Sequence, residues 1–89
     1  MKIRIDQHTL DRAQERGTNA EEIKEVLEKG IPFKAERGRL GKSRVYDFNR
    51  KRLGTFYEQR RVEVIYAVEG DTLITVTAYV FYGKWEGQE

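Results

Sequence analysis

The feature that most constrains the fold of this chain is a change in the spacing of its apolar residues between Gly30 and Ile31. Before this point apolar residues recur every three or four positions, as they do along the buried side of an α-helix. After it they alternate with polar residues, as they do in a β-strand with one buried face. We therefore predict an α+β fold, in which two N-terminal helices pack on one face of an antiparallel sheet of four or five strands.

Capping signals divide the N-terminal segment into two helices. Asp6 is predicted to cap a helix over residues 7–16, which the following glycine ends. Thr18 and Glu21 have the spacing of a capping box at the start of the second helix, and Asn19 offers an alternative start one residue later. Both helices are too short to be stable alone, so each needs the sheet to cover its apolar side.

Turn-forming residues divide the alternating segment into strands. The predicted strands are residues 31–37, 43–48, 55–59, 61–68 and 73–82, with residues 1–5 as a short edge strand or a lead-in. The predicted turns are residues 38–42, 49–54 and 69–71, which join neighbouring strands as hairpins.

The longest predicted strand has one apolar face and one mixed face. The residues expected to face the helices are Ile74, Val76, Ala78 and Val80. The residues expected to face away are Thr75, Thr77, Tyr79 and Phe81, and this side is either solvent-exposed or a binding surface. Because aromatic rings in a small domain are more often buried, we also expect the core to include members of the set Phe33, Phe48, Phe56 and Trp85.

Length and cysteine content limit the architecture to one core. The chain has 89 residues and no cysteine, which predicts a single domain over residues 1–89 without disulfides or thiolate metal sites. One histidine cannot complete a zinc site of recognised spacing, so we expect no metal and no cofactor. The sequence has no signal-peptide or membrane-spanning pattern, which predicts a cytoplasmic protein.

Positive charge is concentrated in the middle of the chain. From Arg37 to Arg61 there are nine basic and two acidic residues, a local charge of +7 in a chain whose net charge is +2. This asymmetry is typical of a surface that faces a polyanion such as RNA. The alternative is that these side chains protect hairpin tips and sheet edges from aggregation. The predicted nucleic-acid-binding residues are Arg37, Arg39, Lys42, Arg50, Lys51, Arg52, Arg60, Arg61 and Lys84.

A second candidate group lies on the first predicted helix. His8, Arg12 and Arg16 are spaced four residues apart, which places them in one row along the helix. Histidine can exchange a proton near neutral pH, and arginine can bind a phosphodiester and stabilise charge on its oxygens. The alternative is an exposed polar face whose charges pair locally.

A third group mixes basic and aromatic residues on the predicted strands. Its members are Arg44, Tyr46, Tyr57, Tyr79, Tyr82 and Lys84. Cationic side chains can neutralise phosphates, while tyrosine rings can stack on bases or supply a phenolic proton. Tyr79 is the strongest candidate, because its position in the strand groups it with threonines and not with valines.

Part of this pattern resembles a known bacterial family. The residues that carry the resemblance are His8, Arg12 and Arg16-Gly17, an acidic helix over residues 21–30, and Thr77-Ala78-Tyr79. They resemble a domain-of-unknown-function family, DUF4258, which is similar to the RelE/ParE-like toxin superfamily. The resemblance implies two helices on an antiparallel sheet. RelE-related members cleave messenger RNA on the ribosome, whereas ParE-like members inhibit gyrase.

The leading hypothesis is therefore a toxin-like, metal-independent endoribonuclease of a toxin–antitoxin system. In it, Arg12, Arg16 and Arg44 bind phosphate, His8 acts as a general acid or base, and Tyr79 orients or protonates the substrate. The expected partners are RNA, including ribosome-bound messenger RNA, and an antitoxin protein; a homodimer is a further alternative. The competing hypotheses are a non-catalytic nucleic-acid- or protein-binding module of the same fold, and a domain with a structural role.

Overall fold

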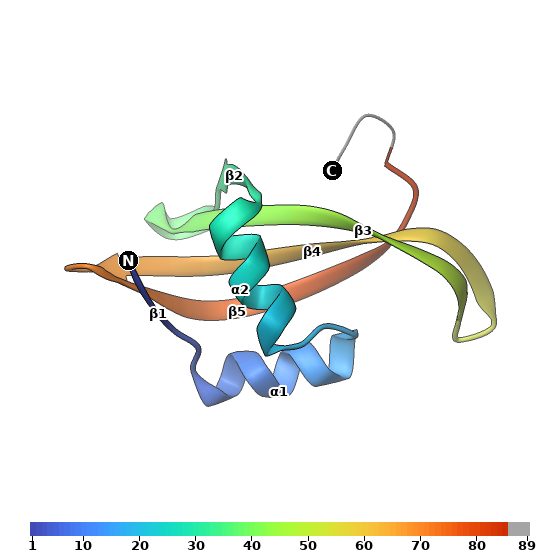
Figure 1. Cartoon of the computed structure of the whole chain (residues 1–89), viewed down its shortest axis with the longest axis horizontal. Helices are drawn as coiled ribbons and strands as arrows, with labels where there is room; N and C mark the ends of the chain where they lie inside the picture. The colour runs from blue at the N-terminus through green and yellow to red at the C-terminus, as the bar shows by residue number, and fades with distance from the viewer. Residues whose placement is uncertain (86–89) are drawn as a thin grey trace.

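The second of two helices lies across one face of a five-stranded sheet, and the first helix runs alongside the last strand (Figure 1). The computed structural model describes residues 1–85. Its helices are α1 (Gln7–Arg16) and α2 (Ala20–Lys29), with a short 3₁₀ turn, η1 (Glu36–Gly38). Its strands are β1 (Lys2–Arg4), β2 (Ile31–Lys34), β3 (Leu40–Arg52), β4 (Thr55–Glu69) and β5 (Thr72–Gly83). The predicted α+β class is confirmed, and neither helix has the length and apolar character needed to cross a membrane.

The sheet is mixed, so the prediction of an antiparallel sheet is only partly correct. Its strand order is β1-β5-β4-β3-β2, and β1 runs parallel to β5, whereas the other neighbours are antiparallel. Hairpins and short loops connect β2, β3, β4 and β5 in succession, so each strand of this series runs antiparallel to the next. Strands β1 and β5 lie near opposite ends of the sequence and are not joined by a hairpin. The direction of β1 instead follows from the packing of α1 beside β5.

The helices begin and end where side chains satisfy their free backbone groups. The Asp6 carboxylate accepts a hydrogen bond from the Thr9 N–H at 2.8 Å, which confirms the predicted start of α1. The Asn19 side chain caps α2 by accepting from the Glu22 N–H at 2.9 Å. The alternative start is therefore correct and the predicted capping box is wrong, because the Thr18 hydroxyl donates to the Glu22 carboxylate instead.

Strands β3 and β4 form a longer hairpin than predicted. The predicted turn over residues 49–54 is wrong for its first four residues, which continue β3 through a bulge at Asn49, where φ is +49°. The turn itself consists of Leu53 and Gly54, with φ of +51° and +85°, as in the type I′ turns of two-residue hairpins. Likewise, β3 begins at Leu40, inside the predicted turn over residues 38–42.

A bulge in β5 also changes which side chains face the helices. Thr77 lies opposite Ile65, but Thr75 lies opposite Tyr66, so β5 has one extra residue, Val76, at this point. Thr75 therefore faces the helices, where its hydroxyl donates to the Thr9 hydroxyl at 2.9 Å. The predicted faces are correct beyond the bulge, where Ala78 is buried, and wrong before it and at the extra residue, for Ile74, Thr75 and Val76.

The core lies between the helices and the middle of the sheet. Its buried residues are Ala13 of α1, Ile23, Val26 and Leu27 of α2, Val62, Val64 and Tyr66 of β4, and Leu73 and Ala78 of β5. None of the four aromatic residues predicted to supply core members belongs to this set, and Phe56 is 55% exposed. We call the face that α2 crosses and the core occupies the helix-covered face, and the other face the open face (Figure 1).

Candidate functional site

A groove of about 520 Å³ lies on the open face, between the β2–β3 loop and strands β4 and β5. Its apolar lining is Phe33, Ala35, Ile65 and Val76, and its polar lining is Lys34, Glu36, Arg37, Arg39, Thr77 and Tyr79. We call this site the Tyr79 groove. It combines cationic, carboxylate and hydroxyl groups over an apolar floor, as expected of a ligand site.

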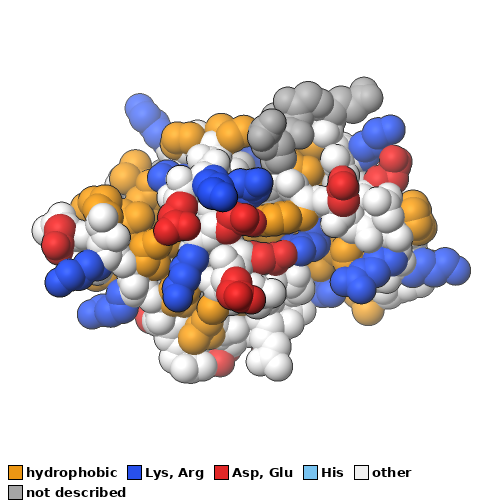
Figure 2. All heavy atoms as spheres, viewed as in Figure 1, with side chains coloured by type: hydrophobic (Ala, Val, Ile, Leu, Met, Phe, Trp, Pro, Cys, Tyr) orange, Lys and Arg blue, Asp and Glu red, His pale blue; other side chains and the backbone are white. Residues whose placement is uncertain are grey.

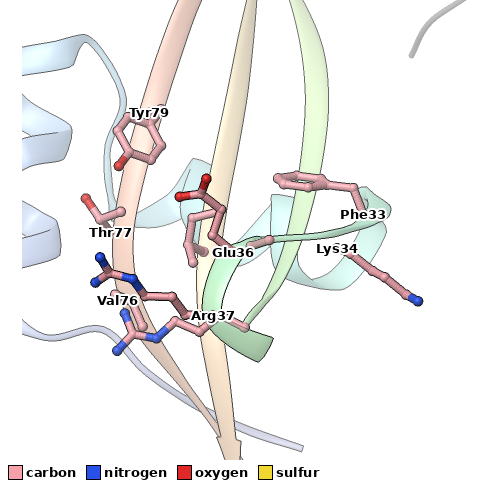
Figure 3. Close-up of a pocket in the computed structure, with 10 residues that line it drawn as sticks. Phe33, Lys34, Glu36, Arg37, Val76, Thr77 and Tyr79 are labelled. Carbon is pink, nitrogen blue, oxygen red and sulfur yellow. The ribbon is translucent and has the colours of Figure 1, made fainter.

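The backbone of the β2–β3 loop directs two charged side chains into the groove. Arg37 and Gly38 both have positive φ, +61° and +70°, which turns the chain sharply after Glu36. A left-handed conformation is uncommon for arginine and is found where the surrounding structure holds it. Figure 3 shows the Glu36 carboxylate pointing toward Tyr79 and the Arg37 side chain extending toward Val76, whereas Lys34 points away.

Gly41 in β3 leaves space for the Phe33 ring, which forms part of the apolar lining of the groove. The Phe33 ring lies so close to Gly41 that a Cβ atom at this position would overlap it. The two residues are also paired across β2 and β3, so the ring covers the backbone of the neighbouring strand. Gly41 therefore fixes the position of the loop that carries Glu36 and Arg37.

Arg16 and Tyr79, two of the predicted catalytic residues, meet at the edge of the groove. The Arg16 guanidinium lies 4.8 Å from the centroid of the Tyr79 ring and donates to the Ala78 carbonyl at 2.7 Å. The Tyr79 ring also stacks on Phe81, with centroids 6.2 Å apart. Because α1 packs along β5, residues 62 or more positions apart in sequence form this cluster.

The other two α1 candidates lie farther along the helix. Eight residues separate His8 from Arg16, a rise of about 12 Å. His8 is exposed and does not line the groove, and Arg12 forms an ion pair with Glu15 at 3.1 Å. The row of three side chains therefore exists as predicted, but only its last member reaches Tyr79.

Arg44 lies on the opposite side of the sheet from Tyr79. Arg44 pairs with Val62 of β4, which is buried on the helix-covered face. Tyr79 pairs with the next residue of β4, Glu63, and adjacent residues of a strand point to opposite faces. The Arg44 guanidinium lies 5.8 Å from the Tyr46 ring. The structure thus does not gather the five predicted catalytic residues into one site.

Comparison with known proteins confirms the resemblance to the DUF4258 family. The family model described as "Domain of unknown function (DUF4258)" matches residues 5–80. The chain belongs to the DUF4258 family. The matched range extends from the segment before α1 to the residue after Tyr79, so it includes every lining residue of the groove. No curated protein and no solved structure matches the chain.

The basic residues of this DUF4258 domain do not form one patch. Four of them make internal contacts: Arg60 with the Glu22 carboxylate, Lys42 with the Leu27 carbonyl at 2.7 Å, Arg61 with Glu63 at 3.3 Å, and Arg52 with the Glu15 carbonyl at 3.2 Å. Lys84 forms an exposed ion pair with Glu58 at 3.7 Å. The remaining members lie in two places. Arg37 and Arg39 line the groove, and Arg50 and Lys51 lie beside Arg52 on the β3–β4 hairpin.

Internal pairing shifts the pKa values of the groups beneath the helices. Burial alone would raise the pKa of Glu22, but hydrogen bonds from Arg60 and Thr18 outweigh it and lower this pKa. Burial and a hydrogen bond to Glu25, 2.6 Å long, raise the pKa of Tyr46. These groups hold α2 against β3 and β4, and they are not available to a ligand.

Sequence reasoning missed Glu36 as a member of the site, and it placed Thr77 on the same face as Tyr79 without assigning it a role. Glu36 was assigned to a strand that in fact ends at Lys34, and only the following Arg37-Gly38 pair indicated a turn. Among the described residues, no three histidine, aspartate or glutamate side chains are close enough to hold a metal ion. The groove therefore offers arginine, carboxylate and phenol groups as its chemistry.

Proposed function

We propose that this DUF4258 protein is a toxin-like, RNA-directed protein, and that its Tyr79 groove binds and cleaves RNA without a metal ion. The observation that carries this proposal is the position of the Arg16 guanidinium on the Tyr79 ring. Glu36 and Arg37 reach toward the same strand from the β2–β3 loop (Figure 3).

Binding would use the cationic and aromatic groups of the groove. Arg16, Arg37 and Arg39 would neutralise phosphates, and bidentate guanidinium–phosphate contacts would fix the backbone of the RNA. Tyr79 is 39% exposed and Phe81 47% exposed, so both rings have a free surface on which an unpaired base can stack. Single-stranded RNA is the substrate class that meets both requirements.

Cleavage would proceed by attack of the ribose 2′-oxygen on the adjacent phosphorus. The Glu36 carboxylate would accept the 2′-hydroxyl proton as the O2′–P bond forms. The P–O5′ bond would break, with the Tyr79 hydroxyl donating a proton to the leaving 5′-oxygen and regaining one from solvent. Arg37 would stabilise the charge that develops on the phosphate oxygens. The products are a 2′,3′-cyclic phosphate and a 5′-hydroxyl end.

His8 and Arg12 would act outside the reacting phosphate. The rise of the helix places them about 12 Å and 6 Å from Arg16, which suits contacts to neighbouring phosphates along the RNA. A proton-transfer role for His8 would require RNA to bend over α1. We therefore assign proton transfer to Glu36 and Tyr79.

The same proposal extends to the biological setting. From the sequence resemblance we extend it to membership in the RelE/ParE-like toxin superfamily, a cytoplasmic location and a ribosome-bound messenger RNA substrate. An antitoxin segment would inhibit such a toxin by covering the groove. A test is co-expression with proteins encoded beside this gene; relief of growth arrest by one of them supports the assignment.

A second candidate is a non-catalytic RNA-binding module. It is favoured by the position of His8 outside the groove and by Arg44 on the other face of the sheet. Such a module would need Arg16, Arg37 and Tyr79 for affinity but would not need the Glu36 carboxylate.

Glu36→Gln separates the two functions. The purified protein is incubated with end-labelled single-stranded RNA in excess EDTA, and binding and cleavage are measured separately. We expect Glu36→Gln to reduce cleavage by about 100-fold, in line with loss of a general base, and to leave binding nearly unchanged. Tyr79→Phe keeps the ring and should also reduce cleavage. Arg44→Gln, on the opposite face, is the control.

The outcome decides between enzyme and binder. Tight binding with no new RNA ends from the wild-type protein would remove the nuclease proposal and leave the binding module. Cleavage that survives Glu36→Gln but is lost in His8→Gln would return proton transfer to the helix. No RNA binding by a folded wild-type protein would overturn both functions.

A further inference from the structure

The β3–β4 hairpin is a second feature that the groove does not use. Its tip, residues 50–57, extends beyond the two helices at one end of a molecule 42 Å long (Figure 1). Two large apolar side chains are exposed here, Leu53 at 95% and Phe56 at 55%. We call this segment the basic hairpin.

Leu53 is unfavourable for the folded chain on two counts. It occupies the first position of a two-residue turn with φ of +51°, where asparagine, aspartate and glycine are strongly preferred. Its side chain is almost fully exposed and therefore gains little from folding. A contact outside the chain would account for leucine at this position.

The basic hairpin is held in a fixed position relative to the body. The Arg52 guanidinium donates to the Glu15 carbonyl at 3.2 Å and lies 4.7 Å from the Tyr82 ring. The Tyr82 hydroxyl donates to the Arg16 carbonyl at 2.8 Å, and its ring packs on Phe48 at 5.1 Å. The hairpin is thus anchored at the C-terminal end of α1, which lowers the entropy lost when it binds a partner.

The exposed charge of this hairpin is entirely positive. Arg50 and Lys51 are exposed, and no acidic residue occurs between Phe48 and Tyr57. Figure 2 shows lysine and arginine side chains gathered at the end of the molecule that the hairpin occupies in Figure 1. The partner is therefore expected to be an anion with an accessible apolar or aromatic surface.

We propose that the basic hairpin is an arm that binds duplex DNA. A two-stranded β-ribbon fits the major groove of B-form DNA, and basic ribbon arms contact the phosphates on either side of a groove. Apolar side chains such as leucine and phenylalanine can insert between base steps as wedges. Arg50 and Lys51 contact the phosphates, and Leu53 and Phe56 contact the base edges or the stack.

The arrangement fits a duplex better than a lipid surface. An anionic bilayer would also attract Arg50 and Lys51, but two apolar side chains give only marginal insertion. A duplex offers phosphates on both sides of the ribbon together with apolar base stacks in its groove. This inference goes beyond the proposed function, since it concerns a different surface and does not depend on cleavage.

The test uses the full chain and four probes. Affinity is measured by fluorescence anisotropy for a short DNA duplex, an RNA duplex of the same sequence and the two single strands, with flotation on phosphatidylcholine–phosphatidylglycerol vesicles in parallel. The variants are Leu53→Asn and the pair Arg50→Gln/Lys51→Gln. The control pair is Lys24→Gln/Lys29→Gln, which makes the same charge change on exposed positions of α2.

We expect duplex affinity to fall about tenfold in each hairpin variant and to stay unchanged in the control. The Arg50→Gln/Lys51→Gln pair should reduce the slope of log affinity against log salt by about 2. Leu53→Asn should keep or raise the thermal midpoint, because asparagine before glycine suits the turn, so its lost affinity is not a folding defect. The RNA duplex should bind more weakly than the DNA duplex, because the deep, narrow major groove of an A-form helix does not admit a ribbon. Equal or tighter binding of the RNA duplex would overturn the assignment to DNA.

Equal duplex affinity in the hairpin variants and the wild type would overturn the inference, as would binding to vesicles without binding to either duplex. The test is separate from that of the groove. Glu36→Gln should keep duplex binding, and the hairpin variants should keep cleavage of short single strands. Failure of one proposal therefore leaves the other standing.

Discussion

Both faces of the sheet carry arginine, but Arg60 on the helix-covered face and Arg37 and Arg39 on the open face differ in burial and pairing. On the helix-covered face, Arg60 pairs with Glu22 of α2, and the two side chains are 14% and 20% exposed. On the open face, Arg37 and Arg39 line a groove, and neither guanidinium forms an ion pair with a described residue. The comparison shows that a local charge of +7 is not a measure of a binding surface, because burial and pairing decide which cations are available.

The largest expected effect concerns packing on the helix-covered face. Ile23 is completely buried between α2 and the sheet. Ile23→Ala should lower the free energy of unfolding by about 3–4 kcal/mol, through lost burial and the cavity it leaves. Chemical denaturation measures this change. On the open face, Phe81→Ala should cost less than about 1 kcal/mol, since nearly half of this ring is already exposed. Equal losses would contradict the distinction between the faces.

Adjacent arginines on opposite faces give the next test. Arg60→Gln leaves the Glu22 carboxylate under the helices without its ion pair and should cost about 2–3 kcal/mol. Arg61→Gln leaves Glu63 beside a hollow on the open face, where water can solvate it, and should cost about 1 kcal/mol or less. Thermal unfolding of both variants under one condition provides the comparison; a larger loss for Arg61→Gln would reverse it.

A smaller effect is expected at the floor of the groove. Gly41→Ala places a methyl group against the Phe33 ring, so the ring must move and the β2–β3 loop with it. We expect a loss of stability of about 1–2 kcal/mol, and weaker RNA binding because Glu36 and Arg37 are displaced. Gly38→Ala, which has no neighbour within contact distance but a positive φ, is the comparison for a purely backbone effect. If folded Gly41→Ala bound RNA as tightly as the wild type, the position of the β2–β3 loop would not determine RNA binding.

The smallest effect is on the acid side of the stability profile. The pKa of Glu22 is lowered in the folded protein, so its contribution is fully present above about pH 4.5, the ordinary value for this group, and is lost as the pH falls through the lowered pKa. The thermal midpoint should therefore decrease between about pH 6 and pH 3. Glu22→Gln should make this decrease shallower, whereas Glu58→Gln, in an exposed ion pair, should not. If the thermal midpoint fell equally with pH in the wild type, Glu22→Gln and Glu58→Gln, Glu22 would not be a source of the stability lost in acid.

The Tyr79 site was partly predictable from the sequence. The row of His8, Arg12 and Arg16 followed from helical spacing, and Tyr79 was correctly placed on the face away from the helices. Grouping Arg44 with Tyr79 was wrong, because the register between two strands decides whether residues on them share a face. The sequence does not give that register. Glu36 was missed because a left-handed residue after it converts a predicted strand into a turn.

By itself, the sequence determined the elements whose signals are local. The change of apolar spacing at Ile31, the Asp6 cap and the glycine after each helix were sufficient to define two helices and an alternating segment, since caps and periodicity depend on neighbouring residues. The tertiary structure alone decided three things: the parallel pairing of β1 with β5, the side of β5 that faces the helices, and the separation of the basic residues into paired and exposed groups. Each depends on contacts between residues far apart in the chain, where one bulge or one ion pair changes the outcome and no short-range pattern records it.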